Sequence, residues 1–426
     1  MIFPETWKTC NISDVMIVER GASPRPIKEY LTNLKDGVNW IKIGDADKDE
    51  KYIYSTHEKI KKEGVLKSRF VHNGDLLLSN SMSFGRPYIL KTSGCIHDGW
   101  LVLHLKSSQL SVDFFYYQLL SQSVYLQFSN LAAGAVVKNL NSDAVKHVEI
   151  VVPPLAEQGR IVAKIEELFA GIDAGVENLK SVKNQIALYR QSVLKSILSG
   201  FATDTLANHV DMCLGKMLDK EKNKGTLFPY LRNKNVRWKN FDLDDLLEMR
   251  FEESEEERYS IQRGDLVVCE GGEPGRCAVW ENDNVIKFQK ALHRLRPHDN
   301  MNVYFLMYVF MLNIQAKNWD RFFTGSTIKH LTGEALKNLQ IPVPTLAEQE
   351  RIVAEIESRF ERADALETAV DRALNDAEKL KQVVLKKAFS GKLVPQNPDD
   401  EPASVLLDRI RAARASELPA KKGKRK

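Results

Sequence analysis

The stretch VPPLAEQGRIVAKIEELF at residues 152–169 returns as VPTLAEQERIVAEIESRF at residues 343–360. The likeness extends to VLKSILSG, which ends at Gly200, and to VLKKAFSG, which ends at Gly391. Leu155 matches Leu346 in the same register in which the two glycines match, so neither copy carries an insertion relative to the other. A repeat of this length and register indicates internal duplication.

Each copy is predicted to form one long helix. Prolines stand directly before it, at Pro153 and Pro154 and again at Pro344, where proline ends a strand without disturbing the helix that follows. Gly200 and Gly391 come at its end, as glycines commonly do at a helix C-terminus. A helix of roughly 40 residues is about 60 Å long.

Apolar residues in both segments recur at alternating steps of four and three, which is the spacing of a coiled-coil seam. The pattern predicts that the two helices pack on each other as an antiparallel coiled coil, although the same residues would also suit core helices of one bundle. The seam residues are Ile161, Ile165, Leu168, Ile172, Leu179, Ile186 and Val193 in the first copy, and Ile352, Ile356, Leu366, Val370, Leu380 and Val384 in the second.

The regions that precede the two helices also resemble each other. GDLLLS at 74–79 matches GDLVVC at 264–269, and GAVVKNL at 134–140 matches GSTIKHL at 325–331. Both regions mix short strand patterns with helical ones, which predicts an α/β fold of the α+β kind. The predicted organisation is a first globular domain, a first spacer helix, a second globular domain, a second spacer helix and a basic C-terminal tail that is flexible at its end, over residues 1–152, 153–200, 201–343, 344–394 and 395–426.

Four local elements are predicted with defined ends. The first domain should contain a buried strand over Trp100–Leu105, a helix over 113–125 that Asp113 caps, and a closing strand over 146–152. In the second domain, the apolar run at 303–312 is too short to span a membrane, and it predicts a buried core helix.

Composition sets limits on the function. The 426 residues are 43% hydrophobic and 28% charged, which is typical of a soluble globular protein and too long for one ordinary core. The net charge of +4 does not by itself indicate a nucleic-acid binder. None of the five cysteines forms a CxxC pair, and the N-terminus lacks the basic and apolar regions of a signal peptide, so a cytoplasmic protein without a zinc site or a disulfide framework is expected.

No catalytic constellation is evident. The sequence has no GxGxxG, no P-loop and no HExxH motif. The acidic run at 252–257 could suggest a metal site, but adjacent glutamates in a polar stretch are more typical of a solvated loop. We therefore expect a non-catalytic chain that carries neither metal nor cofactor.

Matching loops in the two halves offer hydrogen-bond donors that suit DNA. Each of the loops NSMSFGRP and EGGEPGRC follows a strand and contains a Gly-Arg pair, which lets backbone approach a partner and presents a guanidinium to phosphate or guanine. Two loops that run from a glycine to a lysine suit phosphate contacts, and the stretch YLRNKNVRW interleaves aromatic and basic residues at a possible strand edge. The candidate residues are Asn80, Ser81, Ser83, Gly85, Arg86, Gly275 and Arg276; Lys138, Asn139, Ser326, Thr327, Lys329 and His330; and Lys42, Arg232, Lys234 and Arg237.

The alternatives for these loops are a plain turn with a surface arginine, an ordinary solvated loop, and a β-hairpin with a polar face. Recurrence of the Gly-Arg pair at matched places in two otherwise divergent halves favours the functional interpretation of those loops. For YLRNKNVRW, the strand edge facing DNA and the β-hairpin with a polar face both stay open.

Several motifs of the chain resemble those of a known family. The doubled PLAEQ and TLAEQ helix starts, the GD-strand-GR pattern, YLRNKNV and GSTIKHL resemble the specificity subunit of Type I restriction–modification enzymes, over nearly the whole chain to about residue 394. The first Gly-Arg loop departs from the second, since NSMSFGRP stands where the second half has EGGEPGRC. The two domains are therefore expected to bind different half-sites.

The resemblance implies a division of labour. Each target-recognition domain would read one half of a bipartite, asymmetric target on double-stranded DNA, and the coiled coil would set the spacing. Methyltransferase (modification) subunits, two of them, would dock on the helices, and restriction subunits with translocase and nuclease activity would join them. S-adenosylmethionine, ATP and magnesium would belong to those partners and not to this chain, which would serve DNA methylation and host defence.

Two other readings stay open from the residues alone. A coiled-coil adaptor whose globular ends bind proteins would show no sequence-dependent DNA affinity. An enzyme with an unrecognised site would be expected to carry an acid/base pair in each half, and none is seen.

Overall fold

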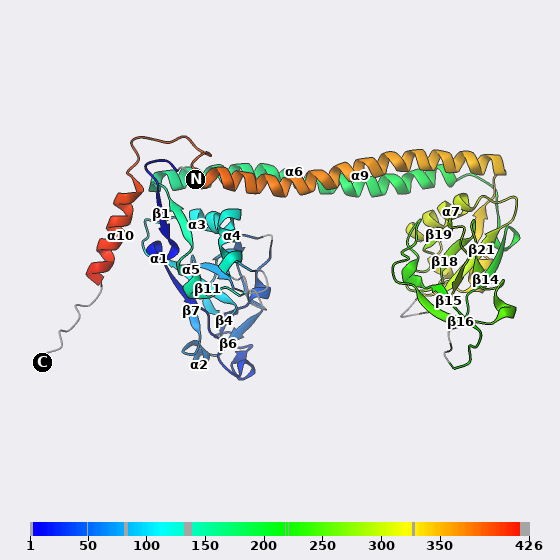
Figure 1. The fold of residues 1–426 in the computed structure, drawn as a ribbon, viewed down its shortest axis with the longest axis horizontal. Coiled ribbons are helices and arrows are strands. Elements are labelled where there is room, and N and C mark those ends of the chain that lie inside the picture. Colours follow the sequence, from blue (N-terminus) through cyan, green and yellow to red (C-terminus); the bar gives the residue numbers. More distant parts are fainter. Residues whose placement is uncertain are drawn as a thin grey trace. The chain divides into compact units, whose positions relative to one another are not determined.

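The computed structural model describes residues 3–48, 50–80, 84–131, 139–217, 219, 221–325 and 329–417. The chain divides into two compact units, the first made of Met1–Glu177 with Leu374–Lys426 and the second of Asn178–Ala373. Each unit holds one globular α/β domain and parts of two long helices, α6 (Leu155–Leu198) and α9 (Leu346–Ala388) (Figure 1). The predicted fold class, two α/β domains with two long helices, is confirmed.

The first domain is built on two five-stranded sheets and a two-stranded ribbon, with the strand orders β2-β11-β8-β9-β5, β3-β6-β4-β10-β7 and β1-β12. The strands are β1 (Lys8–Asn11), β2 (Met16–Arg20), β3 (Leu31–Thr32), β4 (Val38–Ile41), β5 (Tyr52–Ile53), β6 (Glu58–Ile60), β7 (Arg69–Val71), β8 (Leu76–Ser79), β9 (Pro87–Leu90), β10 (Gly94–Ile96), β11 (Trp100–Leu105) and β12 (Glu149–Val152).

Strand β11 is the predicted buried strand and lies between β2 and β8. Its side chains alternate between two cores, as the pleat of a strand requires. Leu101 and Leu103 belong to the cluster that contains the helices, whereas Trp100 and Val102 belong to the cluster shared with the second sheet. Burial on both faces explains why the sequence of β11 is apolar at almost every position.

The helices of the first domain correct two predictions. The helix predicted over 113–125 is two helices, because Ser121 adopts extended dihedral angles and its hydroxyl donates to the Gln118 oxygen. Ser111, not Asp113, caps the first of them by accepting a hydrogen bond from the Phe114 amide. The strand predicted over 146–152 is shorter, because residue 146 still belongs to a helix. The helices are α1 (Ile12–Val15), α2 (Lys62–Val65), α3 (Val112–Leu120), α4 (Gln122–Leu131) and α5 (Ser142–Lys146).

The second domain repeats the plan with two four-stranded sheets, ordered β14-β21-β18-β19 and β16-β15-β20-β17, and the ribbon β13-β22. The strands are β13 (Thr203–Thr205), β14 (Val210–Leu214), β15 (Thr226–Leu231), β16 (Leu247–Phe251), β17 (Ser260–Ile261), β18 (Leu266–Cys269), β19 (Cys277–Val279), β20 (Ile286–Phe288), β21 (Leu292–Pro297) and β22 (Gln340–Pro342).

Two helices accompany these sheets, α7 (Val303–Gln315) and α8 (Gly333–Lys337). The predicted buried core helix is α7, and this prediction is confirmed, since its residues from Phe305 to Leu312 are buried. The Asn302 side chain caps it by accepting hydrogen bonds from the amides of Tyr304 and Phe305.

Two further expectations for the second domain need correction. The basic stretch at 230–238 is not a strand edge along its length, because β15 ends at Leu231 and a 3-10 turn, Asn233–Asn235, follows. Only its end forms a hairpin-like turn, where Val236 pairs antiparallel with Phe241. The acidic run at 252–257 is only partly solvated, because Glu252 and Glu255 both pair with the buried ammonium of Lys216. A buried ammonium needs such partners, and the carboxylates supply them.

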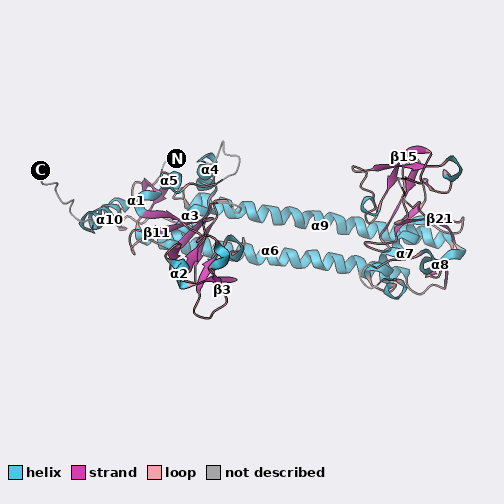
Figure 2. Ribbon diagram, turned by 90° about the horizontal axis from the view of Figure 1, so that it is seen from below, coloured by secondary structure: helices cyan, strands magenta, loops and turns pink. Residues whose placement is uncertain are grey.

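In the first unit, the start of α6 and the end of α9 belong to the core of the globular domain. Ile161 and Ile165 from α6 share one buried cluster with Leu385 from α9 and Phe114 from the domain. Farther along, the Lys381 ammonium lies 2.6 Å from the Asp173 carboxylate. Figure 2 shows the two helices side by side.

In the second unit, a ladder of ion pairs fixes the direction of the helices. Lys183 pairs with Asp371 at 2.7 Å, and Arg190, one heptad later on α6, pairs with Asp364, one heptad earlier on α9, at 2.5 Å. Arg190 also contacts Glu367 at 2.7 Å. Helices paired in this order run antiparallel.

The predicted seam residues differ in burial. Leu168, Ile172 and Leu179 are partly buried, whereas Leu366 and Leu380 are each 50% exposed. The buried members are Ile161, Ile165, Ile186, Val193, Ile352, Ile356, Val370 and Val384.

The segment 395–426, predicted as a tail, contains a further helix, α10 (Ala403–Glu417). Leu406, Leu407 and Ile410 of α10 are buried in the core cluster of the first domain. Before it, Asp400 forms an ion pair with Arg160 of α6 at 2.6 Å. The tail prediction missed this helix, and residues 418–426 lie outside the described part of the chain.

Candidate nucleic-acid interface

The Gly-Arg pairs form the same tight turn in both domains. Gly85 has a φ of +72° and its amide donates to the Ser79 oxygen at 2.9 Å, while Gly275 has a φ of +87° and its amide donates to the Cys269 oxygen at 2.9 Å. Positive φ favours glycine, which explains the residue type at both places. The turn places the following arginine at the same end of the sheet in each domain.

The loop that ends in Leu140 or Leu331 folds back onto the residue that precedes each turn. The Leu140 amide donates to the Asn80 oxygen at 2.9 Å, and the Leu331 amide donates to the Glu270 oxygen at 2.7 Å. Two loops that are far apart in the sequence therefore meet in each domain. Of the predicted contact residues in these loops, Ser81, Ser83, Lys138, Ser326 and Thr327 lie outside the described residues.

The third candidate group belongs to the same corner of each domain. Lys42 and Arg232 each follow a strand that runs parallel to its neighbour, β4 with β10 and β15 with β20, and each precedes a 3-10 turn. In the second domain, the Asn233 side chain donates to the Gly271 oxygen at 2.7 Å, which joins the 3-10 turn to the Gly-Arg loop.

Most candidate cations are held by acidic residues of their own domain. Arg276 contacts Glu273 at 2.5 Å and donates to the Asn233 oxygen at 3.0 Å, and its side chain is only 15% exposed. Arg232 and Lys234 both pair with Asp245. The same holds for Lys42 with Glu58 at 2.7 Å, Arg237 with Asp242 at 3.2 Å, and Lys329 with Asp320 at 3.1 Å.

These ion pairs change how a DNA contact would form. A phosphate that approaches these cations has to displace or share a carboxylate, so part of the attraction is offset. Arg86 differs from its counterpart Arg276. It lies over the ring of Tyr88, with 5.8 Å to the centroid, and within the described part of the chain it has no ion pair, so its charge is not neutralised locally.

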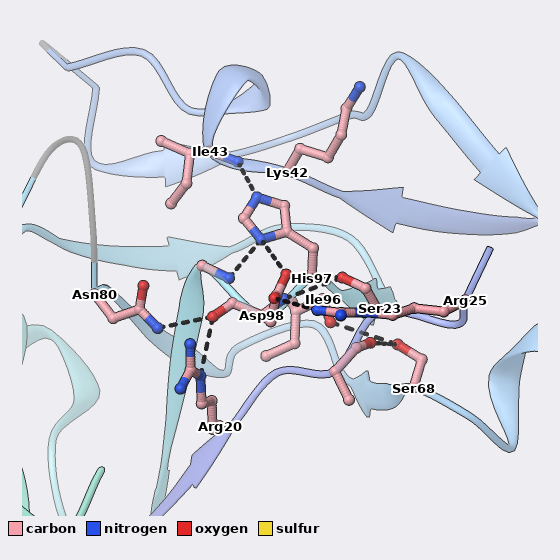
Figure 3. Close-up of polar contacts among 12 residues, drawn as sticks. Arg20, Ser23, Arg25, Lys42, Ile43, Ser68, Asn80, Ile96, His97 and Asp98 are labelled. Carbon is pink, nitrogen blue, oxygen red and sulfur yellow. Dashed lines mark hydrogen bonds and ion pairs between the residues drawn. The ribbon is translucent and has the colours of Figure 1, made fainter. Parts of the chain in front are cut away.

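Sequence reasoning missed the short loop between β10 and β11, residues 97–99, which lies against Asn80. The Asn80 side-chain amide donates to the backbone oxygen of Asp98 at 2.8 Å, and the Asn80 backbone amide donates to the backbone oxygen of Gly99 at 2.9 Å (Figure 3). Two cations join the group. Arg20, the last residue of β2, donates to the Asp98 backbone oxygen at 3.2 Å, and Arg25, in the loop after β2, lies 3.6 Å from the Asp98 carboxylate.

His97 forms the inner part of this loop. Its ring nitrogens lie 3.1 Å from the Ile43 amide and 2.6 Å from the Gly99 amide (Figure 3). A neutral imidazole accepts at one nitrogen only, so one of these contacts carries the hydrogen bond. Burial lowers the pKa of His97, which favours this neutral form.

The described residues contain no group of three or more His, Cys, Asp or Glu side chains that could hold a metal ion. No helix in the described ranges is long and apolar enough to cross a membrane. The arrangement at the loop corner is one of hydrogen-bond donors and acceptors on rigid strand ends, which suits recognition.

The fold and the duplicated loop corner agree with one protein family. The model of the Type I restriction modification DNA specificity domain matches residues 4–184 and again 211–375. The two matches together cover most of the chain, so this protein belongs to that family.

Similarity to characterised relatives extends along nearly the full length of this chain. The chain is 26% identical to the Type I restriction enzyme EcoKI specificity subunit of Escherichia coli (strain K12), covering 99% of this chain and 98% of the relative, and 24% identical to the EcoBI specificity subunit of Escherichia coli, covering 99% and 95%. A solved chain of a type I R-M system covers 92% of this chain and 100% of its own length, with a TM-score of 0.72 at 19% identity. This last likeness supports the fold.

Proposed function

We propose that this chain is the DNA sequence-recognition subunit of a Type I restriction–modification complex. Each globular domain reads one half of a bipartite, asymmetric sequence on double-stranded DNA. The antiparallel helices set the gap between the two half-sites. The chain itself performs no catalysis in this proposal.

One observation carries the proposal. The backbone bonds from Leu140 to Asn80 and from Leu331 to Glu270 bring the same loops together at the same corner of both domains, while the side chains in those loops differ. A conserved frame with divergent surface residues is what two readers of different short sequences require. Weak modules joined in one chain gain affinity through effective concentration.

The helices support a docking role for partner subunits. Leu366 and Leu380 in the predicted seam, together with Leu188 and Val383, are between 46% and 65% exposed. Apolar side chains at such positions favour further helices packing alongside. We infer that two methyltransferase subunits dock here and that restriction subunits join through them.

The chemistry belongs to these partners in our proposal. The methyltransferase subunits bind S-adenosylmethionine, and the restriction subunits use ATP and magnesium. The complex acts where cellular DNA is accessible, which places it in the cytoplasm.

A selection experiment tests the proposal. The chain is purified with its cognate methyltransferase subunits and incubated with duplexes whose central positions are randomised, and the bound duplexes are sequenced. We expect two short fixed base clusters separated by a gap of constant length. Enrichment of one continuous motif, or of none, would contradict the proposal.

A further inference from the structure

The hydrogen bonds around the β10–β11 loop allow the two domains to be compared residue by residue. The His97 amide donates to the Ile41 oxygen at 3.3 Å, and the Gln289 amide donates to the Leu231 oxygen at 3.2 Å. On the other side of the loop, the Asn80 amide donates to the backbone oxygen of Gly99, and the Glu270 amide donates to the backbone oxygen of Ala291, both at 2.9 Å. Asp98 and Lys290 are the residues between these matched bonds, so they occupy the same place in their domains.

A second pair of matched backbone hydrogen bonds positions the loops that carry Asp98 and Lys290. The Gly21 amide donates to the Trp100 oxygen at 2.9 Å, and the Gly215 amide donates to the Leu292 oxygen at 3.0 Å. A side chain at either glycine would meet the backbone oxygen of the facing loop, His97 or Gln289, at 2.1 Å. Both loops are therefore closely packed against the neighbouring strand end, which gives positions 98 and 290 a fixed backbone.

The side chains at this place carry opposite charge. Asp98 is 46% exposed, and one carboxylate oxygen accepts a hydrogen bond from the Ser23 hydroxyl at 2.8 Å. Lys290 is exposed, and within the described residues its ammonium has no ion-pair partner. The residue that bonds to this loop also differs between the domains: it is Asn80, with a neutral amide side chain, in the first and Glu270, with a carboxylate, in the second.

The surroundings in the first domain suit a duplex. Arg20 and Arg25 contact Asp98 (Figure 3), and their positive charge attracts the phosphate backbone. Phosphates repel a carboxylate, and the two neighbouring arginines offset this repulsion. The carboxylate can accept a hydrogen bond from the amino group of cytosine or adenine in the major groove. A lysine at the same place donates to the acceptors of guanine.

We propose that Asp98 and Lys290 are specificity-determining residues that occupy the same structural position and read opposite base chemistries. Asp98 selects a base with an exocyclic amino group, cytosine or adenine, in the half-site of the first domain. Lys290 selects guanine in the half-site of the second. This inference rests on the proposed function, since it assigns individual positions within the two half-sites.

The test uses the complete chain in complex with its methyltransferase subunits. The wild type, Asp98→Lys and Lys290→Asp are compared by mapping methylated adenines in a genome and by competition binding to duplexes with single base-pair changes. Glu149→Lys and Lys337→Asp are controls with the same charge changes, at exposed positions on β12 and α8. Asp98→Asn keeps an acceptor for Ser23 and removes the charge, so it separates reading from folding.

We expect Asp98→Lys to change one position of one half-site towards guanine and Lys290→Asp to change one position of the other half-site towards cytosine or adenine. The gap and the remaining positions stay the same, and discrimination at the altered position shifts on the order of 10- to 100-fold. We expect Asp98→Asn to weaken the base preference at the same target position whose preference Asp98→Lys changes. The two controls leave the target as it is.

Three results would overturn the inference. An unchanged target in Asp98→Asn and Lys290→Asp would do so, as would a loss of binding that is uniform over all sequences, which marks a phosphate contact. A change in both half-sites from one substitution would also contradict it. If the wild-type complex shows no split target, the proposed function fails; if the split target is present and insensitive to both positions, only this inference fails.

Discussion

Asp75 and His104 face each other where β8 and β11 pair, with Oδ1 of the carboxylate 3.0 Å from Nδ1 of the ring. The matching place in the second domain holds Asp265 and Arg296, which form two hydrogen bonds at 2.7 and 2.9 Å. The two domains thus use the same ion-pair position, but only the first uses a residue that titrates near neutral pH.

The first prediction concerns the pH dependence of stability. The hydrogen bond to Asp75 raises the pKa of His104 above its ordinary value of 6.5, so its contribution is fully present below that value and is lost as pH rises through the raised pKa. We expect His104→Gln to reduce the free energy of unfolding by about 1 kcal/mol or less below pH 6.5, because the pair is partly exposed. Denaturant unfolding at pH values below and above 6.5 measures the difference in the free energy of unfolding between the wild type and His104→Gln. A difference that grows as pH rises would contradict the assignment.

The second prediction concerns the Gly-Arg turn. Gly275→Ala puts a side chain at a φ of +87° and its Cβ 2.3 Å from Cδ1 of Ile314, so we expect a loss of about 1–2 kcal/mol of stability. Gly159→Ala is the matched control, because Gly159 lies in α6 with open space around its Cβ position and alanine favours a helix by roughly 1 kcal/mol. Thermal unfolding of both variants provides the comparison. Equal effects would show that the turn does not constrain the residue.

The third prediction separates buried from exposed seam residues. Ile356→Ala removes a side chain that is 0% exposed, so we expect a loss of about 2–5 kcal/mol. Leu366→Ala removes a side chain that is 50% exposed, so in the isolated chain the loss should stay below about 1 kcal/mol. Chemical denaturation followed by circular dichroism measures both. Equal losses for Leu366→Ala and Ile356→Ala would show that both side chains pack in the interior, which would contradict this prediction.

The fourth prediction concerns the spacing function of the helices. One heptad is inserted between Lys183 and Arg190 and another between Asp364 and Asp371, so that both ion pairs of the ladder are kept. Seven residues lengthen each helix by about 10 Å, and we expect the gap between half-sites to grow by roughly three base pairs. Sequencing of selected duplexes measures the gap. An insertion in α6 alone is the control, since it breaks the register and should abolish selection, and an unchanged gap in the double insertion would refute the spacing role.

The two long helices could be predicted from the sequence because their signals are local and repeated. The prolines before each helix, the glycines after it and the heptad spacing of residues such as Ile161 and Ile352 all agree. The buried helix α7 and the strand β11 could be predicted from a different local signal, a run that is apolar at all or nearly all positions.

Other features depend on contacts that no local pattern reveals. At Ser121 the backbone becomes extended and ends the helix, although no glycine or proline stands there to indicate a break. Asp245 holds both Arg232 and Lys234, yet it lies in a loop without a counterpart pattern in the first half. The equivalence of Asp98 and Lys290 is hidden because the residues differ, and only the backbone hydrogen bonds establish it.

The central claim is that two domains of one chain read two separate DNA half-sites at a fixed distance. Mapping methylated adenines across a genome in cells that express this chain with its methyltransferase subunits tests it most directly. The account predicts methylation at one asymmetric target made of two short specific parts and an unspecified gap of constant length. Methylation at a continuous motif, at targets with a variable gap, or without sequence preference would contradict it.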